Sequence, residues 1–437
     1  MLQTLRNAWK IPELRKKFLF TLLLLIVFRF GNVIPVPWIE KSAIEAWLKE
    51  GQVGGASSLF SLLDTFSGGA FSGATIFAMS ISPYINSSII MQLLCVAIPA
   101  LERMSKEGEE GRRKITKITR YLTVVLAAVQ AFGLYKALDV KGAISAPEGV
   151  PSWLAAVTII LAFTAGTAFL MWLGEQITGR GIGNGISMLI FAGIVSRVPH
   201  MFFTAWQGFI GRGMWYWFVA LLLYSLLSIM FVVLVNQAER RIPVQYAKRV
   251  VGRKMYGGQS SNIPIKVAMA GVIPIIFAMS IMSFPGTLAQ IFGSQPDDFL
   301  YKATQFLTSG ATYPILYFLL IVGFTYFYTS ITFNPIEVSN NIKNNNGMIP
   351  GIRPGRSTTD YITKVLNRLT LIGSLFLGII AVLPIVLTEV FRDTLPAGIE
   401  SLSLTGTSLL IVVGVALETV REVESQMVMR HYKGFLE

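Results

Sequence analysis

The sequence predicts an all-α membrane protein, and three observations support that fold class. Of the 437 residues, 53% are hydrophobic and only 14% are charged, too few charges to cover the surface of a soluble chain of this length. Runs of about 20 apolar residues recur, and each is about 30 Å long as a helix, the thickness of bilayer hydrocarbon. Because lipid offers the backbone no hydrogen-bond partners, spanning segments are helices or strands of a closed barrel, and these runs are too long for barrel strands.

Ten apolar runs are long enough to span, which places both ends of the chain on the same side of the membrane. The first run follows Lys16 and Lys17 and lacks a small-residue cleavage site, so we expect a retained helix and not a signal peptide. The predicted spans are, in order, Phe18–Val36, Ala74–Ile98, Thr119–Leu138, Trp153–Leu173, Gly185–Thr204, Met214–Asn236, Val267–Thr287, Thr312–Phe333, Leu369–Val390 and Leu404–Val420.

Basic residues set the predicted orientation. Most of the 37 Lys and Arg residues fall on segments that share a side with the N-terminus, and the opposite loops hold few. Because cytoplasmic loops carry the excess of basic residues, both termini are predicted to be cytoplasmic. The net charge of +13 follows from this topology, so it does not by itself indicate binding to nucleic acid.

Side chains suited to catalysis or metal binding are scarce. Cys95 is the single cysteine, which excludes an internal disulfide and most metal-site patterns. The two histidines, His200 and His431, lie near a helix end and in the C-terminal tail, so no histidine relay crosses the middle of the membrane. The stretch "GRGIGNG" at residues 179–185 has no βαβ unit around it, and its glycines predict a tight connection with close helix approach. We therefore expect no cofactor, no metal and no enzymatic activity.

Two features near the first span leave alternatives open. Arg29 lies inside the span, where an arginine costs about 2.5–3.5 kcal/mol at a helix centre. It is either a snorkelling or packed arginine, or a residue that borders an aqueous cavity. The segment "SSLFSLLDTFSGGAFSG" at 57–73 is too short to cross and too apolar for water. It is either a re-entrant half-helix, ended by Gly68 and Gly69, or an amphipathic helix on the outer interface.

The second span contains "SISPYINSSIIMQ" (80–92), whose polar groups find no partners in lipid. On a helix, Ile81, Ile85, Ser88 and Gln92 fall on one stripe, apolar near mid-membrane and polar toward the cytoplasm. Pro83 is predicted to kink this helix. The stripe suits an aqueous funnel that narrows to an apolar constriction. The alternative is that these polar groups hold neighbouring helices together.

Two other spans carry similar features. The fifth span places Ile186 and Ile190 on one face, directly after the glycine-rich turn. The seventh span contains Pro274 and Pro285, which are predicted to break an apolar helix.

A short repeat relates the two halves of the chain. "FAMSI" occurs at 77–81 and again at 277–281, either by chance or because ten spans divide into two inverted sets of five. The predicted halves are residues 1–205, with a half-helix near 57–70, and residues 206–437, with cytoplasmic loops at 237–266 and 334–368.

The two cytoplasmic loops of the second half are long and basic. Topology calls for one or two basic residues at each helix end, whereas these loops add many Gly, Pro and Asn turn signals. We expect them to dock a macromolecule that presents an acidic protein surface or RNA phosphates, and anionic lipid headgroups are the alternative. The predicted contact residues are Arg240, Arg241, Lys248, Arg249, Arg253, Lys254, Arg353 and Arg356.

Several long motifs, in order along the chain, resemble the signature segments of the SecY family, the channel subunits of bacterial protein-export translocases. They are "SPYINSSIIMQLL", "EGRRKITKITRY", "FLMWLGEQITGRGIGNGIS", "RRIPVQYAKR", "MAGVIPIIFA", "FNPIEVSNNIK", "IPGIRPG" and "GTSLLIVV". The resemblance covers essentially the whole chain and implies ten helices, in two inverted five-helix halves, around a central hourglass pore.

The resemblance also implies roles for individual residues. The apolar ring of the pore would consist of Ile81, Ile85, Ile186, Ile190, Ile276 and Ile411. A mobile plug would include Leu59, Phe60, Leu62, Leu63, Phe66, Gly68 and Gly69. The second and seventh spans, with the third and eighth, would form a lateral gate, represented by Ser82, Asn86, Ser88, Gln92, Pro274 and Ser280.

The function implied by the resemblance is a protein-conducting channel in the bacterial cytoplasmic membrane, for export of unfolded polypeptides and lateral insertion of membrane proteins. The implied partners are SecE-like and SecG-like small subunits, the SecA motor ATPase, ribosomes and signal-sequence-bearing polypeptides. The ATPase or the ribosome would supply the energy, and Arg353 matches the family's functional arginine in "PGIRPG". The alternative is a small-solute secondary transporter, which the large basic loops and the scarcity of mid-membrane ionisable groups disfavour.

Overall fold

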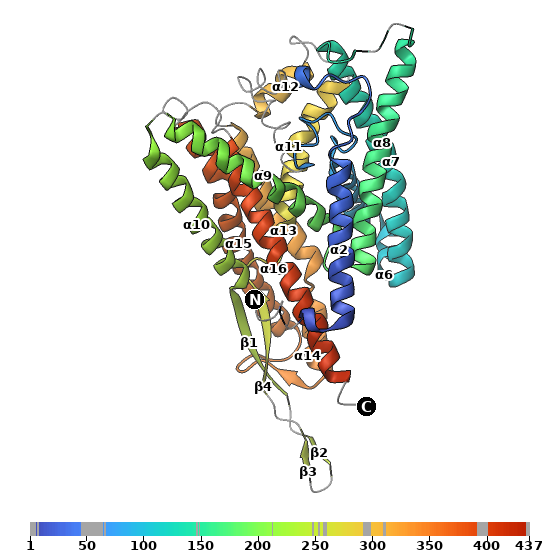
Figure 1. Ribbon diagram of the computed structural model, residues 1–437. Coiled ribbons are helices and arrows are strands. Elements are labelled where there is room, and N and C mark those ends of the chain that lie inside the picture. The colour runs from blue at the N-terminus through green and yellow to red at the C-terminus, as the bar shows by residue number, and fades with distance from the viewer. Residues whose placement is uncertain are drawn as a thin grey trace.

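The computed structural model describes the chain as a bundle of helices with short strands gathered at one end (Figure 1). The described residues are 6, 8–44, 64, 67–145, 147, 149–211, 213–246, 249–251, 254–256, 260–291, 299–308, 312–390 and 401–433. Each of the ten predicted spans overlaps a helix. These helices are α2 (Pro12–Gly31), α5 (Ser82–Ala97), α7 (Glu109–Val140), α8 (Ser152–Arg180), α9 (Gly185–Ile210), α10 (Trp215–Gln237), α11 (Ile273–Ile291), α13 (Thr312–Thr332), α15 (Arg356–Val390) and α16 (Ser401–Lys433).

Length and composition alone select fewer helices than ten. Among the described residues, six helices are long and apolar enough to cross a membrane. A seventh qualifies when α5 is joined to the short helix α6 (Pro99–Lys106), from which it is bent by 102°. The bend falls at Ile98, whose extended backbone (φ −107°, ψ 113°) is the conformation that a following proline imposes.

The start of the second span is not helical, so two predictions about it are wrong. The helix begins at Ser82 and not at Ala74, because the chain from residue 71 to residue 81 runs through turns, with positive φ at Ala74 and Ser80. Pro83 lies in the first turn of α5 and does not kink it. In that position the missing N–H has no helical partner to lose, so proline starts the helix.

The non-helical segment before α5 is held between two helices. Val36 N donates to Ala74 O at 2.8 Å and Ile76 N donates to Ile34 O at 3.1 Å, so the chain that leaves α2 pairs with the chain that enters α5. Phe77 stacks between Phe28 of α2 and Phe169 of α8. This packing fixes the chain that leads to Ile81.

The seventh span shows the same shift at its start. Residues 267–272 form turns, and α11 begins at Ile273, so Pro274 again occupies the first turn of a helix and does not break one. Pro285 lies inside α11, which continues beyond it to Ile291. The FAMSI repeat therefore adopts turns at 77–81 and a helix at 277–281.

The two long basic loops fold together into one unit, which the sequence did not predict. A three-stranded antiparallel sheet has the order β4 (Ser260–Lys266), β1 (Glu239–Tyr246) and β5 (Gly347–Met348), and therefore joins both loops. A second hairpin of β2 (Arg249–Val251) and β3 (Lys254–Tyr256) projects beyond the helices (Figure 1). The unit includes α14 (Pro335–Asn344), and its own apolar core consists of Ile242, Val244, Ile265, Ile342, Ile349, Ile362 and Leu366. One further short helix, α12 (Phe299–Thr308), lies toward the opposite end of the molecule (Figure 1).

The glycine-rich connection between α8 and α9 is tight, as predicted. Gly183 has a φ of +74°, and the side-chain oxygen of Asn184 accepts hydrogen bonds from Ile186 N and Ser187 N, which caps the start of α9. A Cβ atom on Gly185 would overlap the carbonyl oxygen of Gly174 on α8. Helices α8 and α9 can therefore approach only because residue 185 has no side chain.

We expect Gly185→Ala to lower the free energy of unfolding by about 1–3 kcal/mol, since the added methyl group must push α8 and α9 apart. The measurement is the thermal unfolding midpoint of the purified protein in detergent. Gly179→Ala is the matched control, because a Cβ atom there meets nothing within 4 Å. Equal midpoints for the two variants would contradict this account of the connection.

Candidate functional site

A small cavity at the start of α5 is lined by five isoleucines and two serines. Its volume is about 20 Å³, room for about one water molecule. The isoleucines come from the start of α5 and from α9, α11 and α16, segments far apart in the chain. The lining residues are Ser80, Ile81, Ser82, Ile85, Ile190, Ile276 and Ile411.

The isoleucines close the space between the helices. Ile81, Ile190 and Ile411 expose 4% of their surface or less, and all three belong to one hydrophobic cluster with residues of α2 and α8. Ile85 and Ile276 are half-buried and pack against the same cluster. An apolar constriction of this size holds no continuous column of water, so it can block ions without any bonded contact.

Ile186, the sixth predicted ring residue, is not among those that line the cavity. It packs against the same hydrophobic cluster, and a Cβ atom on Gly174 of α8 would come within 2.6 Å of its Cδ1 atom. Its place in the ring therefore stays a prediction.

The polar residues predicted for the lateral gate lie on α5 and at the start of α11. Ser82 lines the cavity, while Asn86 is half-buried and Gln92 Nε2 donates to Ser88 Oγ at 3.3 Å. Pro274 is buried on α11. The remaining residue of the predicted set is Ser280, which is half-buried on α11. Helix α11 contacts α5, α7 and α13. Together with α11, these are the four helices predicted to border the gate.

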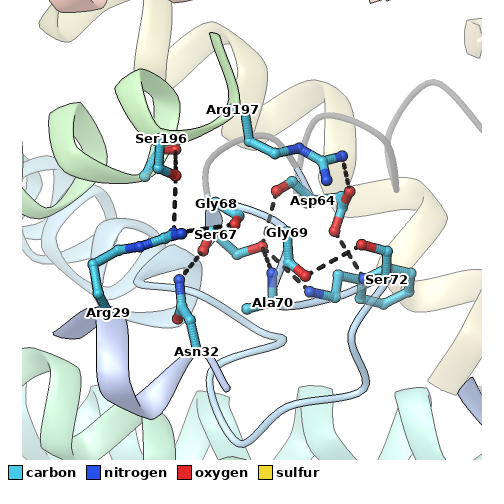
Figure 2. A network of polar contacts seen from close by, with 12 residues as sticks. Arg29, Asn32, Asp64, Ser67, Gly68, Gly69, Ala70, Ser72, Ser196 and Arg197 are labelled. Carbon is cyan, nitrogen blue, oxygen red and sulfur yellow. Dashed lines mark hydrogen bonds and ion pairs between the residues drawn. The ribbon is translucent and has the colours of Figure 1, made fainter. Parts of the chain in front are cut away.

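Asp64 and residues 67–72 form a compact turn that polar contacts hold together (Figure 2). Gly69 N donates to Asp64 O at 2.8 Å, and Gly68 and Gly69 have φ values of +71° and +89°. This bond and these left-handed φ values are those of a helix C-terminus. That this turn is the end of a plug stays a prediction. The predicted plug residues Leu59, Phe60, Leu62, Leu63 and Phe66 lie outside the described residues.

Three side chains, from α2, from the residue that caps its end and from α9, hold that turn (Figure 2). Arg29 of α2 donates to Gly68 O at 3.3 Å and to Ser196 Oγ at 2.9 Å. Asn32 Nδ2 donates to Ser67 O at 2.7 Å. Arg197 of α9 forms an ion pair with Asp64. Arg29 thus bonds to protein at Gly68 O and Ser196 Oγ while its side chain stays exposed, and both alternatives for Arg29 stay predictions.

Sequence reasoning missed the ion pair between Asp64 and Arg197, although a signal for it exists. Asp64 is the one acid in the apolar stretch "SSLFSLLDTFSGG", and Arg197 is a cation inside the predicted fifth span. Ionisable residues in apolar segments are costly and are usually paired with one another. Two such residues of opposite sign point to a contact, but the pair is separated by 133 residues and only the fold brings it together.

The basic residues predicted for docking gather on the unit formed by the two loops. Arg240 and Arg241 are exposed on β1, and Arg241 Nε contacts Glu239 Oε1 at 2.7 Å. Arg353 and Arg356 are exposed next to the start of α15, within the same unit. The remaining predicted residues are Arg249 on β2 and Lys254 on β3, whose backbones belong to the projecting hairpin, and Lys248 and Arg253, which lie outside the described residues.

Two hydrogen bonds hold the backbone of the loop that carries Arg353. Thr358 Oγ1 donates to Arg353 O at 2.9 Å, and Ser339 Oγ of α14 donates to Gly355 O at 2.9 Å. These bonds fix the backbone while the Arg353 side chain stays exposed. At the opposite end of the sheet, partial desolvation and then repulsion from Arg421 lower the pKa of Lys266. The exposed arginines of β1 and of the loop with Arg353 give the unit its outward positive charge.

Comparison with known proteins shows which family has this architecture. The family model described as SecY matches residues 75–420. A Thermotoga maritima protein described as "Protein translocase subunit SecY" is 46% identical over 440 residues, which cover 100% of this chain and 98% of that protein.

Solved channel structures share the fold at low sequence identity. One is a SecY structure, with a TM-score of 0.64 at 19% identity and 97% of each chain covered. Its description states that the plug domain of that SecY protein stabilises the closed state of the translocation channel and maintains a membrane seal. Sec61 in a canine ribosome–channel complex from the endoplasmic reticulum has a TM-score of 0.63 at 18% identity, again with 97% of each chain covered. The predicted fold class, an all-α membrane protein with ten spanning helices, is confirmed by this likeness.

Proposed function

The chain belongs to the SecY family of protein translocase subunits, and from this premise we propose that its isoleucine cavity is the seal of a protein-conducting channel. The channel exports unfolded secretory polypeptides and releases membrane segments sideways into lipid. The observation that supports this assignment best is the convergence of isoleucines from four helices on a space for about one water molecule.

The chemistry of isoleucine suits a pore that must pass any sequence. Its side chain offers no hydrogen-bond donor or acceptor, so a polypeptide in transit meets no site that binds a particular residue. The contacts between the isoleucines are dispersion contacts, which are individually weak and re-form around an object of another shape. The ring therefore closes on itself at rest and closes around the polypeptide during transport.

Two further parts complete the proposed channel. The segment that ends at Gly68 and Gly69 is the plug, which lies beside the seal and leaves when a polypeptide enters. Helices α5 and α11 form the lateral gate, because they contact each other and both contribute isoleucines to the cavity. Separation of these two helices opens the seal toward lipid, and the half-buried Asn86, Ser88 and Gln92 give the opening a polar lining.

Energy and partners are proposed to come from outside the chain. The exposed arginines of the loop unit, Arg240, Arg241, Arg353 and Arg356, suit an acidic surface of a SecA-like motor ATPase or the phosphates of ribosomal RNA. SecE-like and SecG-like subunits are proposed to cover lipid-facing helices, and anionic lipids to contact the basic cytoplasmic surface. Family membership supports these partners, and one solved relative is a ribosome–channel complex.

The chain is a multi-pass membrane protein, and we place it in the bacterial cytoplasmic membrane with both termini in the cytoplasm. The excess of basic residues in the segments that share a side with the termini, including the two long loops, supports this orientation. The small-solute transporter, the alternative raised by the sequence, finds no support in the relatives, which are translocase subunits and channels.

A photocrosslinking amino acid tests the function. Placed at residue 85 or at residue 411, it is expected to capture a secretory polypeptide that is stalled during export by a folded domain at its end. The matched control is residue 226 on α10, where Leu226 is 67% exposed on the outside of the bundle and no capture is expected. Lack of capture at both cavity positions, in vesicles that accumulate a small solute, would contradict the channel.

A further inference from the structure

Two arginines from different helices converge on the end of the plug segment (Figure 2). Arg29 of α2 donates to the carbonyl oxygen of Gly68 and to Ser196 Oγ, and Arg197 of α9 pairs with Asp64. We call Arg29, Arg197, Asp64 and Gly68 the clasp. It joins α2 and α9 through a segment of chain that belongs to neither helix.

The carboxylate of Asp64 is buried, and its burial depends on the groups that pair with its two oxygens. Its side chain is 4% exposed, while that of Arg197 is 29% exposed. One carboxylate oxygen faces Arg197, and the other accepts a hydrogen bond from Ser72 N at 2.8 Å. Removal of one partner from such a pair leaves an uncompensated charge in a site of low dielectric, which is strongly unfavourable. The plug can keep Asp64 buried only while Arg197 is present.

The backbone of the plug is shaped to accept both guanidinium groups. A Cβ atom on Gly68 would lie 2.9 Å from Ser196 Oγ and 3.0 Å from Arg29 Nη1. A Cβ atom on Gly69 would lie 3.0 Å from Arg197 Nη1. Both glycines also have positive φ, so any other residue would be strained and would push the arginines away.

The clasp is mechanically connected to the isoleucine seal. Arg197 follows Ile190 by seven residues on α9, so the two side chains lie on the same face, two turns apart. Ala70, directly after the clasp, belongs to the same hydrophobic cluster as Ile81, Ile190 and Ile411. A shift of α9 that separates Ile190 from the other isoleucines therefore also pulls Arg197 away from Asp64.

We propose that Arg29 and Arg197 are positioning residues that hold the plug closed through Asp64 and Gly68, and that the clasp sets how readily a polypeptide opens the channel. This inference rests on the proposed channel function. A weaker clasp raises the fraction of channels without a seated plug. Such channels leak ions at rest and admit polypeptides whose signal sequence is too weak to open the normal channel.

A charge-exchange experiment tests the ion pair. Asp64→Asn and Arg197→Gln are each expected to raise the resting potassium leak of reconstituted vesicles by about tenfold, because Asp64→Asn removes the anion that holds Arg197 and Arg197→Gln leaves the buried carboxylate without its cation. The double variant Asp64→Arg/Arg197→Asp restores opposite charges and is expected to leak less than either single variant. Lys136→Gln, on the exposed surface of α7, removes a positive charge outside the clasp and is expected to leave the leak unchanged.

Two results would overturn the clasp. One is a wild-type leak in both single variants when equal amounts of folded protein are reconstituted, as checked by their thermal unfolding midpoints. The other is a double variant that leaks as much as the two single changes combined. Capture of a stalled polypeptide at residue 85 is measured in the same vesicles. If the polypeptide is captured and the leak is unchanged, the proposal of the clasp is wrong and the channel function stands. If the wild type captures no polypeptide, the channel function itself is wrong.

Discussion

Replacement of Ile81, Ile190 and Ile411 together by serine is expected to raise the resting ion leak of reconstituted vesicles by at least about 100-fold. All three side chains are nearly fully buried beside the cavity. A buried isoleucine contributes about 1.5–3 kcal/mol relative to an exposed one, and a factor of 100 corresponds to about 2.8 kcal/mol. Serine also offers a hydroxyl group to water, so the constriction becomes wet.

The matched control for the triple variant carries serine on the outside of the bundle. Val219, Leu223 and Leu226 on α10 are each at least 50% exposed, so their replacement changes the lipid-facing surface and not the cavity. Ion leak is measured by the decay of a potassium gradient after equal amounts of each protein are reconstituted. A cavity variant that leaks no more than the α10 variant would mean that the isoleucines do not form the seal.

Reversal of the charge at Arg353 is expected to reduce motor-driven export by about tenfold or more and to leave membrane insertion of the chain intact. The side chain is exposed on a loop that hydrogen bonds hold in place, so Arg353→Glu changes the charge without disturbing the core. Two unit charges 4 Å apart interact by about 4 kcal/mol at an effective dielectric constant of 20, and reversal turns such an attraction into repulsion.

Lys364→Glu provides the matched charge reversal for Arg353→Glu. Lys364 is exposed on α15, about two turns beyond Arg356, and is not among the predicted docking residues. Export of a secretory precursor is measured with purified motor ATPase and vesicles of each variant. If Arg353→Glu exports normally, or if both variants lose activity equally, Arg353 has no particular part in docking.

The sequence alone predicted the helices well, because length and hydrophobicity decide which segments can cross lipid. It predicted their ends poorly where proline was involved. Pro83 and Pro274 were expected to bend helices, but each lies in a first turn, and proline is compatible with both positions. The FAMSI repeat shows the same limit, since identical residues form turns before α5 and a helix in α11.

Two other features depend on contacts that local sequence does not specify. The strands β1 and β4 alternate buried and exposed residues at Ile242, Val244 and Ile265, a weak pattern in a loop dominated by charge. The clasp requires Asp64 and Arg197 to meet across 133 residues. Helical spacing indicated an apolar constriction at Ile81 and Ile85, the full isoleucine ring was predicted through resemblance to a family, and the structure brings five of its six predicted residues together.

The most direct measurement is a cryo-electron microscopy structure of the reconstituted channel with a polypeptide stalled in transit. We expect continuous polypeptide density that passes between Ile81, Ile85, Ile190, Ile276 and Ile411, with the plug segment displaced from Arg197. Polypeptide density that runs elsewhere, while these five isoleucines remain in contact with one another, would contradict this expectation.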